Sequence, residues 1–372
     1  MAETSCSAVL VVRDEAATLG DCLRSIRDLV DEIVVLDTGS SDDTRDIAQD
    51  AGARVIRSRW LDDFSLVRNE ASSHARGDWI FSIDADERVV RGDRAYLHSL
   101  TADTSASAFR VWLRPGPMFT RSLHWRLFRN DPRIRFEGRI RESVAPSIRR
   151  LSAAPGGPAV RACEIAIDHS DEPVVRGKKH VRDLALLRQA LAEHPDNVVY
   201  WTDLGRALDA IGQRDEALEA WERAVAIVRR DGATLPSATL PFTDMLQRLP
   251  EHDARRPELL DEATARFPDD PLVTWLRAET LVGERSFSEA LPLLERLSAL
   301  DADADVFPEL SYDRRIFGEF AYAALAHAHA GLGRWGEAAD WYERAARLAP
   351  GTLEYRTKEA LARARRNTLR LA

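Results

Sequence analysis

Up to residue 90, the chain alternates short apolar runs with longer segments in which apolar residues recur every three or four positions. The apolar runs are typical of buried strands, and we expect strands at residues 7–12, 32–36, 54–56 and 79–83. The segments between them have the period of amphipathic helices, which we expect at residues 18–29, 42–51 and 64–75. This alternation indicates a parallel sheet that is covered by helices on both faces. In such a sheet, ligands bind at the carboxyl ends of the strands.

The pattern loosens between residues 93 and 168. Two short β-like pieces stand at residues 108–113 and 134–136, and the Pro/Gly-rich residues 154–158 predict an exposed loop. We interpret this segment as the second half of the same α/β domain. The sequence therefore predicts a first domain at residues 1–178 and a helical domain at residues 179–372.

The helical part contains a repeat. Residues fall at the offsets of the tetratricopeptide pattern, a helix-turn-helix unit of about 34 residues, in two places. One copy is carried by Trp201, Leu204, Gly205, Leu208, Gly212, Ala217, Trp221 and Ala224, and the other by Tyr322, Leu325, Ala326, Gly333, Ala338, Tyr342, Ala345 and Pro350. Residues 275–300 fit a weaker copy, and residues 257–267 predict another helix. The alternative is an unrelated helical bundle.

Charge and cysteine content narrow the partners and the compartment. The formal net charge is −9, whereas domains that bind nucleic acid normally carry a basic excess, so we expect no nucleic-acid partner. The three cysteines show neither disulfide nor metal-ligand spacing, as in a reduced cytosolic protein. No run approaches the roughly 18 apolar residues that a membrane span requires. We expect a cytoplasmic protein with no transmembrane segment, and peripheral attachment to a membrane stays open.

Polar side chains follow three of the expected strands where each strand ends. Asp84 and Asp86 stand two residues apart, so both carboxylates can point to the same face, where they suit Mg²⁺ or Mn²⁺. Acidic pairs at strand ends are also commonly solvated turn residues. Asp37 can accept hydrogen bonds from a base or ribose, unless it and Ser40 cap the next helix. The polar residues 13–15 follow a third strand. Because three adjacent strands each end in polar residues, we expect a ligand site there.

Several short motifs follow one another in this part of the chain. They are LVVRDE at 10–15, VDEIVVLDTGS at 30–40, WLDDFS at 60–65 with Arg68-Asn69, GDWI at 77–80 and DADE at 84–87. Together they resemble family 2 glycosyltransferases of the GT-A fold, and most closely the branch that is fused to tetratricopeptide repeats and includes bacterial peptide S- and O-glycosyltransferases. The resemblance continues through RLFRN at 126–130, FEG at 136–138 and IDH at 167–169.

The resemblance implies a nucleotide-sugar donor, typically a UDP-sugar, and a divalent cation, Mg²⁺ or Mn²⁺. By position, it implies that the donor is contacted by Val12, Arg13, Glu15, Asp37, Arg68, Asp84 and Ala85. It implies that Asp86 and His169 are the metal ligands. Since histidine also occurs at ordinary core and surface positions, a role without a ligand stays open for His169.

One position departs from the pattern of the family. Similar proteins carry a His-Glu pair after the Phe-x-Gly segment, and this chain has Arg141-Glu142. Arginine stays protonated and cannot ligate a metal, so we expect Arg141 to hold the diphosphate together with Arg126 and Arg129. Inverting transfer needs a base that removes the acceptor proton. Glu142 is the first candidate and Glu137 the second, although Arg141-Glu142 can also be a surface salt bridge.

Other classes of protein are weighed by single features. A dinucleotide-binding enzyme needs a glycine-rich turn after the first strand, and RDEAA at residues 13–17 excludes it. A repeat scaffold whose enzyme domain has decayed stays an alternative. Repeat arrays present concave surfaces that suit extended peptides, so we expect transfer of a hexose, with inversion, to a peptide or protein. A saccharide, lipid-linked or natural-product acceptor is the alternative. We expect Trp201, Trp221 and Trp341 of the repeats in the core, and contacts of such aromatics in a homodimer stay open.

Overall fold

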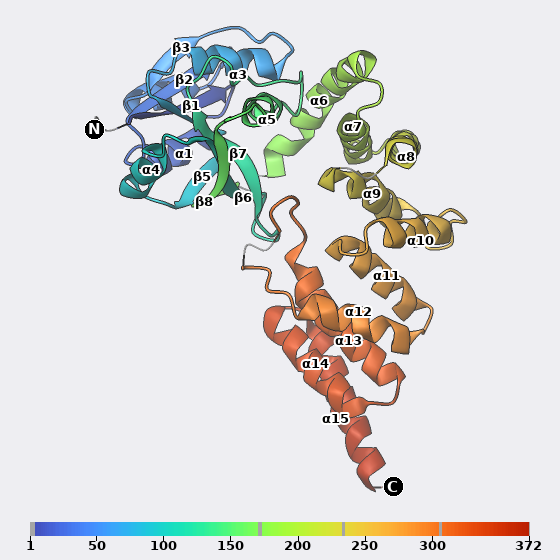
Figure 1. The fold of residues 1–372 in the computed structure, drawn as a ribbon. Helices are drawn as coiled ribbons and strands as arrows, with labels where there is room; N and C mark the ends of the chain where they lie inside the picture. The colour runs from blue at the N-terminus through green and yellow to red at the C-terminus, as the bar shows by residue number, and fades with distance from the viewer. Residues whose placement is uncertain (1–3, 170–172, 233–234, 305–306, 372) are drawn as a thin grey trace. The chain divides into compact units, whose positions relative to one another are not determined.

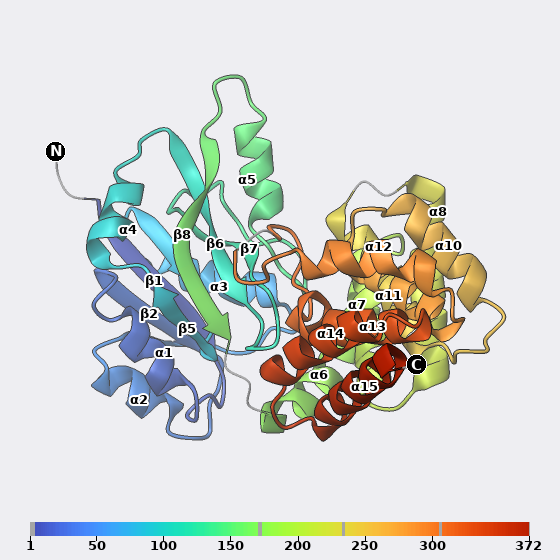
Figure 2. The ribbon, with the colours of Figure 1, turned by 90° about the horizontal axis from the view of Figure 1, so that it is seen from below.

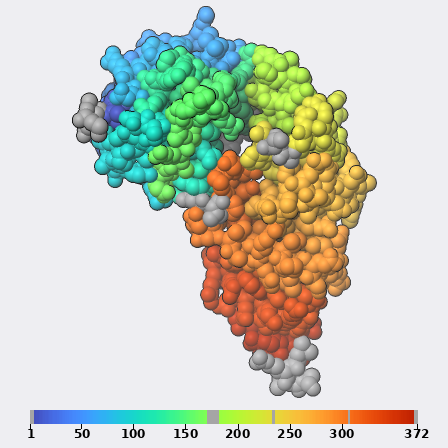
Figure 3. Space-filling model, in the orientation of Figure 1, coloured from blue at the N-terminus to red at the C-terminus, as the bar shows by residue number. Residues whose placement is uncertain are grey.

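The computed structural model describes residues 4–169, 173–232, 235–304 and 307–371 (Figure 1). The chain forms two compact units. The first comprises Met1–Pro117 and Arg121–Arg214, and the second comprises Met118–Thr120 and Asp215–Ala372. Figure 3 is a space-filling view in which the colour runs from blue at the N-terminus to red at the C-terminus.

An eight-stranded mixed sheet forms the centre of the first unit. Its strands are β1 (Cys6–Val12), β2 (Glu32–Asp37), β3 (Arg54–Arg57), β4 (Trp79–Ser82), β5 (Glu87–Arg91), β6 (Ala106–Arg114), β7 (Ser122–Arg129) and β8 (Ala159–His169), in the order β3-β2-β1-β4-β7-β6-β8-β5. Strands β1 to β4 run parallel, and β8 runs parallel to β6. Strand β7 pairs antiparallel with β4 and β6, and β5 with β8. The strands β1 and β2 end together, because Val12 is in register with Asp37.

Helices cover both faces of this sheet (Figures 1 and 2). One face packs against α1 (Leu19–Ile26), α2 (Thr44–Asp50) and α4 (Arg94–Thr101), and the other against α3 (Phe64–Ser73) and α5 (Ala145–Ser152). The three-and-four spacing of Leu19, Leu23 and Ile26 turns all three side chains of α1 into the first core. Burying each such side chain stabilises the fold by about 1.5–3 kcal/mol.

The four expected strands and three expected helices of the N-terminal part are present as β1–β4 and α1–α3, and residues 108–113 lie in β6. The strand expected at residues 134–136 is wrong. Phe136 is buried, but its backbone N–H donates to Asn69 Oδ1 and its carbonyl accepts from Asn69 Nδ2, both at 2.9 Å. An apolar run can be a strand or a buried loop, and here an amide side chain of α3 replaces the neighbouring strand.

Helices predominate in the rest of the described chain. In the first unit they are α6 (Pro173–Glu193) and α7 (Val198–Ala210), and in the second α8 (Arg214–Asp231), α9 (Leu240–Arg248), α10 (Arg256–Arg266), α11 (Pro271–Gly283), α12 (Phe287–Ser298), α13 (Glu319–Gly331), α14 (Trp335–Leu348) and α15 (Leu353–Leu371). The small residues of the repeat let neighbouring helices approach. A Cβ on Gly331 of α13 would lie 2.1 Å from the ring of Phe287 of α12.

The predicted fold class, an α/β domain with a mostly parallel sheet before an all-helical region, is confirmed. The compact units divide after Arg214, whereas the sequence places the end of the first domain at residue 178. The helices α6 and α7 lie between these two positions. Within the described ranges, no helix has both the length and the apolar character needed to cross a membrane.

Candidate active site

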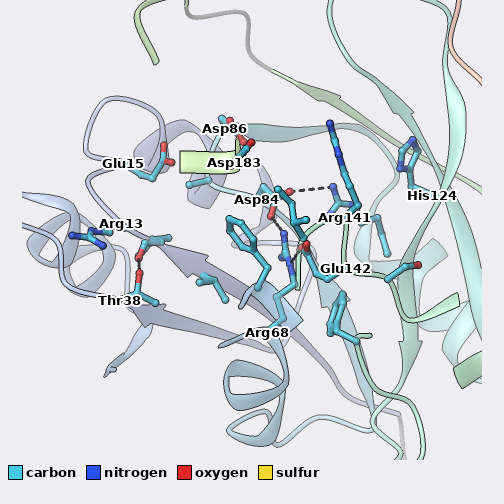
Figure 4. Close-up of a pocket in the computed structure, with 18 of the residues that line it drawn as sticks. Arg13, Glu15, Thr38, Arg68, Asp84, Asp86, His124, Arg141, Glu142 and Asp183 are labelled. Carbon is cyan, nitrogen blue, oxygen red and sulfur yellow. Dashed lines mark hydrogen bonds and ion pairs between the residues drawn. The ribbon is translucent and has the colours of Figure 1, made fainter. Parts of the chain in front are cut away.

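A cavity of about 850 Å³ opens in the first unit where β1 and β4 end (Figure 4). In the view of Figure 4, Arg13 and Thr38 lie at one end, His124 lies at the other, and Asp84 lies between them. Its walls are formed by Val11, Val12, Arg13, Glu15, Thr38, Trp60, Phe64, Arg68, Asp84, Ala85, Asp86, His124, Trp125, Arg126, Phe136, Ile140, Arg141, Glu142, Ser143, Val144, His169, Arg182 and Asp183. The cavity thus gathers residues from the beginning, the middle and the end of this unit.

Asp84 stands between two arginines. Arg68 of α3 donates to Asp84 Oδ1 at 2.6 Å, and Arg126 of β7 donates to Oδ2 at 3.2 Å. Burial alone would raise the pKa of Asp84, but the charges of Arg68 and Arg126 outweigh it and hold its pKa well below the ordinary value. Asp84 is therefore ionised at neutral pH, and the two guanidinium groups are fixed at the cavity wall.

Glu87 contacts both Asp84 and Arg126, and the sequence pattern does not single it out. Its carboxylate accepts from the backbone N–H of Asp84 at 2.8 Å and from Arg126, and its side chain is only 2% exposed. Burial raises the pKa of Glu87 and exceeds the opposing effect of the Arg126 charge. The carboxylate of Glu87 thus holds the turn that follows β4, and Glu87 itself does not line the cavity.

Asp86 and His169 meet although 83 positions separate them. Asp86 Oδ2 lies 3.2 Å from His169 Nε2, because β5 pairs with the end of β8 and places Glu87 beside His169. Among the described residues, no group of three or more His, Cys, Asp or Glu side chains is placed to hold a metal ion. Mg²⁺ and Mn²⁺ do not require such a group, since they commonly bind one or two protein ligands and complete their shell with phosphate and water. The pair therefore fits a cation that a diphosphate also ligates.

The expected nucleotide rim is present in part. Val12, Arg13 and Glu15 line the cavity, whereas Asp37 does not. Asp37 is 1% exposed, and its carboxylate accepts from the N–H of Ser40 at 3.1 Å. It does not cap α2, which begins at Thr44 with Asp43 as its N-cap residue. Thr38, which the sequence analysis did not single out, takes the place of Asp37 at the wall.

The two candidate bases lie in different surroundings. Glu142 lines the cavity, its side chain is 12% exposed, and Arg68 donates to its Oε1. Glu137 does not line the cavity and forms an ion pair with Arg150 of α5. Arg68 therefore links Glu142 to Asp84, and the structure brings the first candidate, but not the second, to the cavity.

The three arginines that we expected around the diphosphate are also separated. Arg126 and Arg141 line the cavity, but Arg129 does not. Arg129 lies over the ring of Trp79, with its guanidinium 4.7 Å from the ring centre, and donates to backbone carbonyls beyond α4. Both arginines lie on β7, but the register of β7 with β6 shifts at Arg126, and the structure gives the two side chains different surroundings. Arg141 is bound through two nitrogens to Asp203 of α7, at 2.7 and 3.1 Å.

His124 is a further cavity residue that the sequence analysis missed. It stands two positions before Arg126 on β7, where the register with β6 shifts between Leu127 and Trp125, so strand alternation gave no signal for it. Burial, with a further contribution from the Arg126 charge, lowers the pKa of His124 to about 4. The imidazole is therefore neutral near pH 7, and one ring nitrogen lies 3.1 Å from the hydroxyl of Ser122. Such a ring can accept or donate a hydrogen bond inside the cavity.

The first unit is an α/β fold with a cavity that charged residues line where β1 and β4 end. Two segments match known families: residues 7–132 match Glycosyl transferase family 2, and residues 319–352 match the tetratricopeptide repeat. The N-terminal part of the chain thus carries a glycosyl transferase family 2 domain, and its C-terminal part carries a tetratricopeptide repeat. The resemblance seen in the sequence is thereby confirmed.

Among curated proteins, the chain is similar to a TPR repeat-containing protein of Synechococcus elongatus, with 36% identity over 58% of this chain and 55% of that protein. It is also similar to the SPbeta prophage-derived glycosyltransferase SunS of Bacillus subtilis, with 23% identity over 58% of this chain and 52% of that protein. The chain spans about half the length of these relatives.

Solved structures resemble it more loosely. Glucosyl-3-phosphoglycerate synthase from Mycobacterium tuberculosis, in complex with Mn²⁺, uridine diphosphate and glucosyl-3-phosphoglycerate, has 18% identity and a TM-score of 0.38 over 51% of this chain and 80% of that chain. The mannosyltransferase PcManGT from Pyrobaculum calidifontis, in complex with GDP-Man and Mn²⁺, has 15% identity and a TM-score of 0.40 over 74% of this chain and 84% of that chain.

Proposed function

We propose that this chain transfers a hexose from a nucleotide sugar, of the UDP-sugar class, to a peptide or protein side chain with inversion at the anomeric carbon. The observation that carries the proposal is the shared cavity, in which Arg68 joins the carboxylate of Asp84 to that of Glu142. The family match over residues 7–132 supports the class of reaction.

The donor would lie along the cavity from the rim to Asp84. Arg13, Glu15 and Thr38, which line the cavity, would contact the nucleotide, and Arg126 and Arg68 would neutralise the diphosphate. Guanidinium groups bind phosphate oxygens through parallel charge-assisted hydrogen bonds. Since Asp84 and Glu87 already hold Arg126, this donor site is organised before the ligand binds.

Asp86 and His169 would hold the divalent cation, Mg²⁺ or Mn²⁺. When bound, such a cation neutralises charge on the departing diphosphate.

Glu142 is the proposed base. Its carboxylate would take the proton from the acceptor hydroxyl or thiol while the acceptor oxygen or sulfur attacks the anomeric carbon. The bond from that carbon to the diphosphate oxygen breaks with its electron pair, and attack from the opposite side inverts the configuration. The proton ends on Glu142, and the negative charge ends on the nucleoside diphosphate.

The reaction is tested by turnover of the donor alone. Purified protein with UDP-glucose and Mn²⁺ should release UDP slowly by transfer to water, and Asp86→Ala should abolish the release. Glu137→Gln is the matched control, because Glu137 is paired with Arg150 outside the cavity. A screen of nucleotide sugars covers other donors. Failure to turn over any of them would favour the alternative of a repeat scaffold whose enzyme domain has decayed.

The acceptor is tested by removing the second unit. Repeat arrays present concave surfaces that suit extended peptides, which supports a peptide or protein acceptor. A chain that ends at residue 214 keeps α6 and α7 with the first unit, and it should release UDP but lose transfer to peptide acceptors. Intact-mass detection of an added hexose measures the transfer. Transfer by the shortened chain would contradict a role of the repeats, and transfer only to saccharides or lipid-linked sugars would support the alternative acceptor class.

A further inference from the structure

The residues around Glu142 form a tight loop, which we call the Glu142 loop (residues 137–143). Its ends are joined by two backbone hydrogen bonds of 3.0 Å between Glu137 and Ser143. On one side α3 holds the loop, since the N–H of Phe64 donates to the carbonyl of Arg139 at 2.8 Å. These contacts fix the two ends of the loop, including Ser143 after Glu142, and one flank, but they do not involve the backbone of Arg141 before Glu142.

The helices α6 and α7 hold the other flank. Gly138 lies so close to α7 that a Cβ there would be 2.9 Å from the Tyr200 hydroxyl, and Arg139 forms a 2.8 Å ion pair with Glu193 of α6. Arg141 forms the two-nitrogen ion pair with Asp203 of α7. Three neighbouring residues of the loop thus each have a partner on this helical hairpin.

Of these three contacts, only the ion pair of Arg141 involves a residue other than glycine in a left-handed backbone conformation. Arg141 has a φ of 56°, in the left-handed region that a side-chain-bearing residue adopts at an energetic cost. Such a conformation persists only where the surroundings fix it. Asp203 is 7% exposed, and its carboxylate has two cationic partners: Arg141 at 2.7 Å and, more loosely, Arg206 of the same helix at 3.6 Å.

Glu142 follows Arg141 directly, so the backbone of Arg141 sets the direction in which the Glu142 carboxylate leaves the loop. We propose that Asp203 is a positioning residue: by holding Arg141 in its left-handed conformation, it keeps Glu142 aimed into the cavity. The proposal rests on the proposed function for the role of Glu142 as base. The helices α6 and α7 would then help to position a catalytic residue of the first unit.

Asp203→Asn removes the charge of the partner and keeps its shape. Because a base that is displaced by about 1 Å can cost roughly a hundredfold in rate, we expect kcat for UDP release to fall about tenfold to a hundredfold, with KM for the donor unchanged within about twofold. A merely structural role would lower the active fraction, and it would not separate kcat from KM after normalisation to folded protein. Unchanged kcat would overturn the proposal. A rise in donor KM with constant kcat would also overturn it, since Arg141 would then be a diphosphate ligand.

A reversed ion pair tests rescue. Aspartate tolerates the left-handed conformation better than most residues, so Arg141→Asp combined with Asp203→Arg should recover at least about a third of the wild-type kcat, whereas each single change should not. Asp253→Asn, which removes the charge of the ion pair with Arg255 in the second unit, is the matched control and should leave kcat unchanged. Absence of recovery in the double variant would contradict the proposal.

Hydrogen exchange separates this inference from the proposed function. In full-length Asp203→Asn, the amides of the Glu142 loop should exchange at least about tenfold faster than in wild type, while those of β1 stay unchanged. If the wild-type protein turns over no donor, the proposed function fails, and the exchange of the loop still decides whether Asp203 fixes it. Unchanged exchange would overturn the inference in either case.

Discussion

Arg68 offers the sharpest test of how the cavity is held together. Its side chain is 13% exposed and donates both to Asp84 and to Glu142, whose side chains are 31% and 12% exposed. Arg68→Met keeps most of the length and the contact with the ring of Phe136, but removes the charge. The change leaves two carboxylates at the cavity wall with less compensation.

The magnitude follows from these contacts. A hydrogen bond to a charged group contributes about 1.5–3 kcal/mol, so two of them bound the loss at about 3–6 kcal/mol. Asp84 keeps Arg126 at 3.2 Å and is partly solvated, which favours the lower end, about 3 kcal/mol. With a urea dependence of about 2 kcal/mol per molar, the unfolding midpoint of the first unit should fall by about 1.5 M.

The loss should also depend on pH. The arginines lower the pKa of Asp84, so the stabilisation is fully present above the unfolded value of 3.8 and is lost as pH falls toward the folded value. The gap between wild type and Arg68→Met should therefore be constant from pH 6 to pH 8. It should narrow below about pH 4.

The assay must report the two units separately. Urea unfolding of protein with 5-fluorotryptophan, followed by ¹⁹F NMR, does so, because Trp79 is buried in the first unit and Trp221 in the second. The Trp79 midpoint should fall and the Trp221 midpoint should not. Arg133→Met, which removes one exposed arginine of the first unit, is the control. The reasoning is refuted if Arg68→Met and the control shift the Trp79 midpoint equally.

Three further predictions concern single side chains. Glu142→Gln should lower kcat by about 10²- to 10⁴-fold with little change in donor KM, whereas Glu137→Gln should leave both constants unchanged, and steady-state UDP release measures them. His124 should show no imidazole titration by NMR between pH 8 and about 5.5, because its pKa is lowered to about 4. The free energy of unfolding should therefore decrease as pH falls from about 6.5 toward 4. An imidazole transition near pH 6.5 would be inconsistent with the burial of His124. Arg126→Met should raise donor KM at least about tenfold, whereas Arg129→Met should change it less than twofold because Arg129 bonds backbone carbonyls away from the cavity; equal effects would show that our assignment of the two arginines is wrong.

Local pattern determined much of the fold. The alternation of apolar runs with helix-period segments predicted β1–β4 and α1–α3, because the spacing of apolar residues reflects which helix face or which strand is buried. The same pattern failed at residues 134–136, where an apolar run pairs with Asn69 rather than with a strand. The hydrophobicity of a segment indicates that it is buried, but it does not indicate which group forms hydrogen bonds with its backbone.

Only the tertiary structure decided which candidate residues share a cavity. The sequence by itself determined that polar residues end the strands, since Asp84, Asp86 and Glu15 follow apolar runs directly. It ranked Glu142 before Glu137 without placing either in a cavity, and it did not distinguish Arg126 from Arg129, because the direction of a side chain depends on strand pairing and loop closure. Nor did it connect Arg141 with a buried aspartate 62 positions later, a contact that exists because a helix of the C-terminal half packs beside the loop.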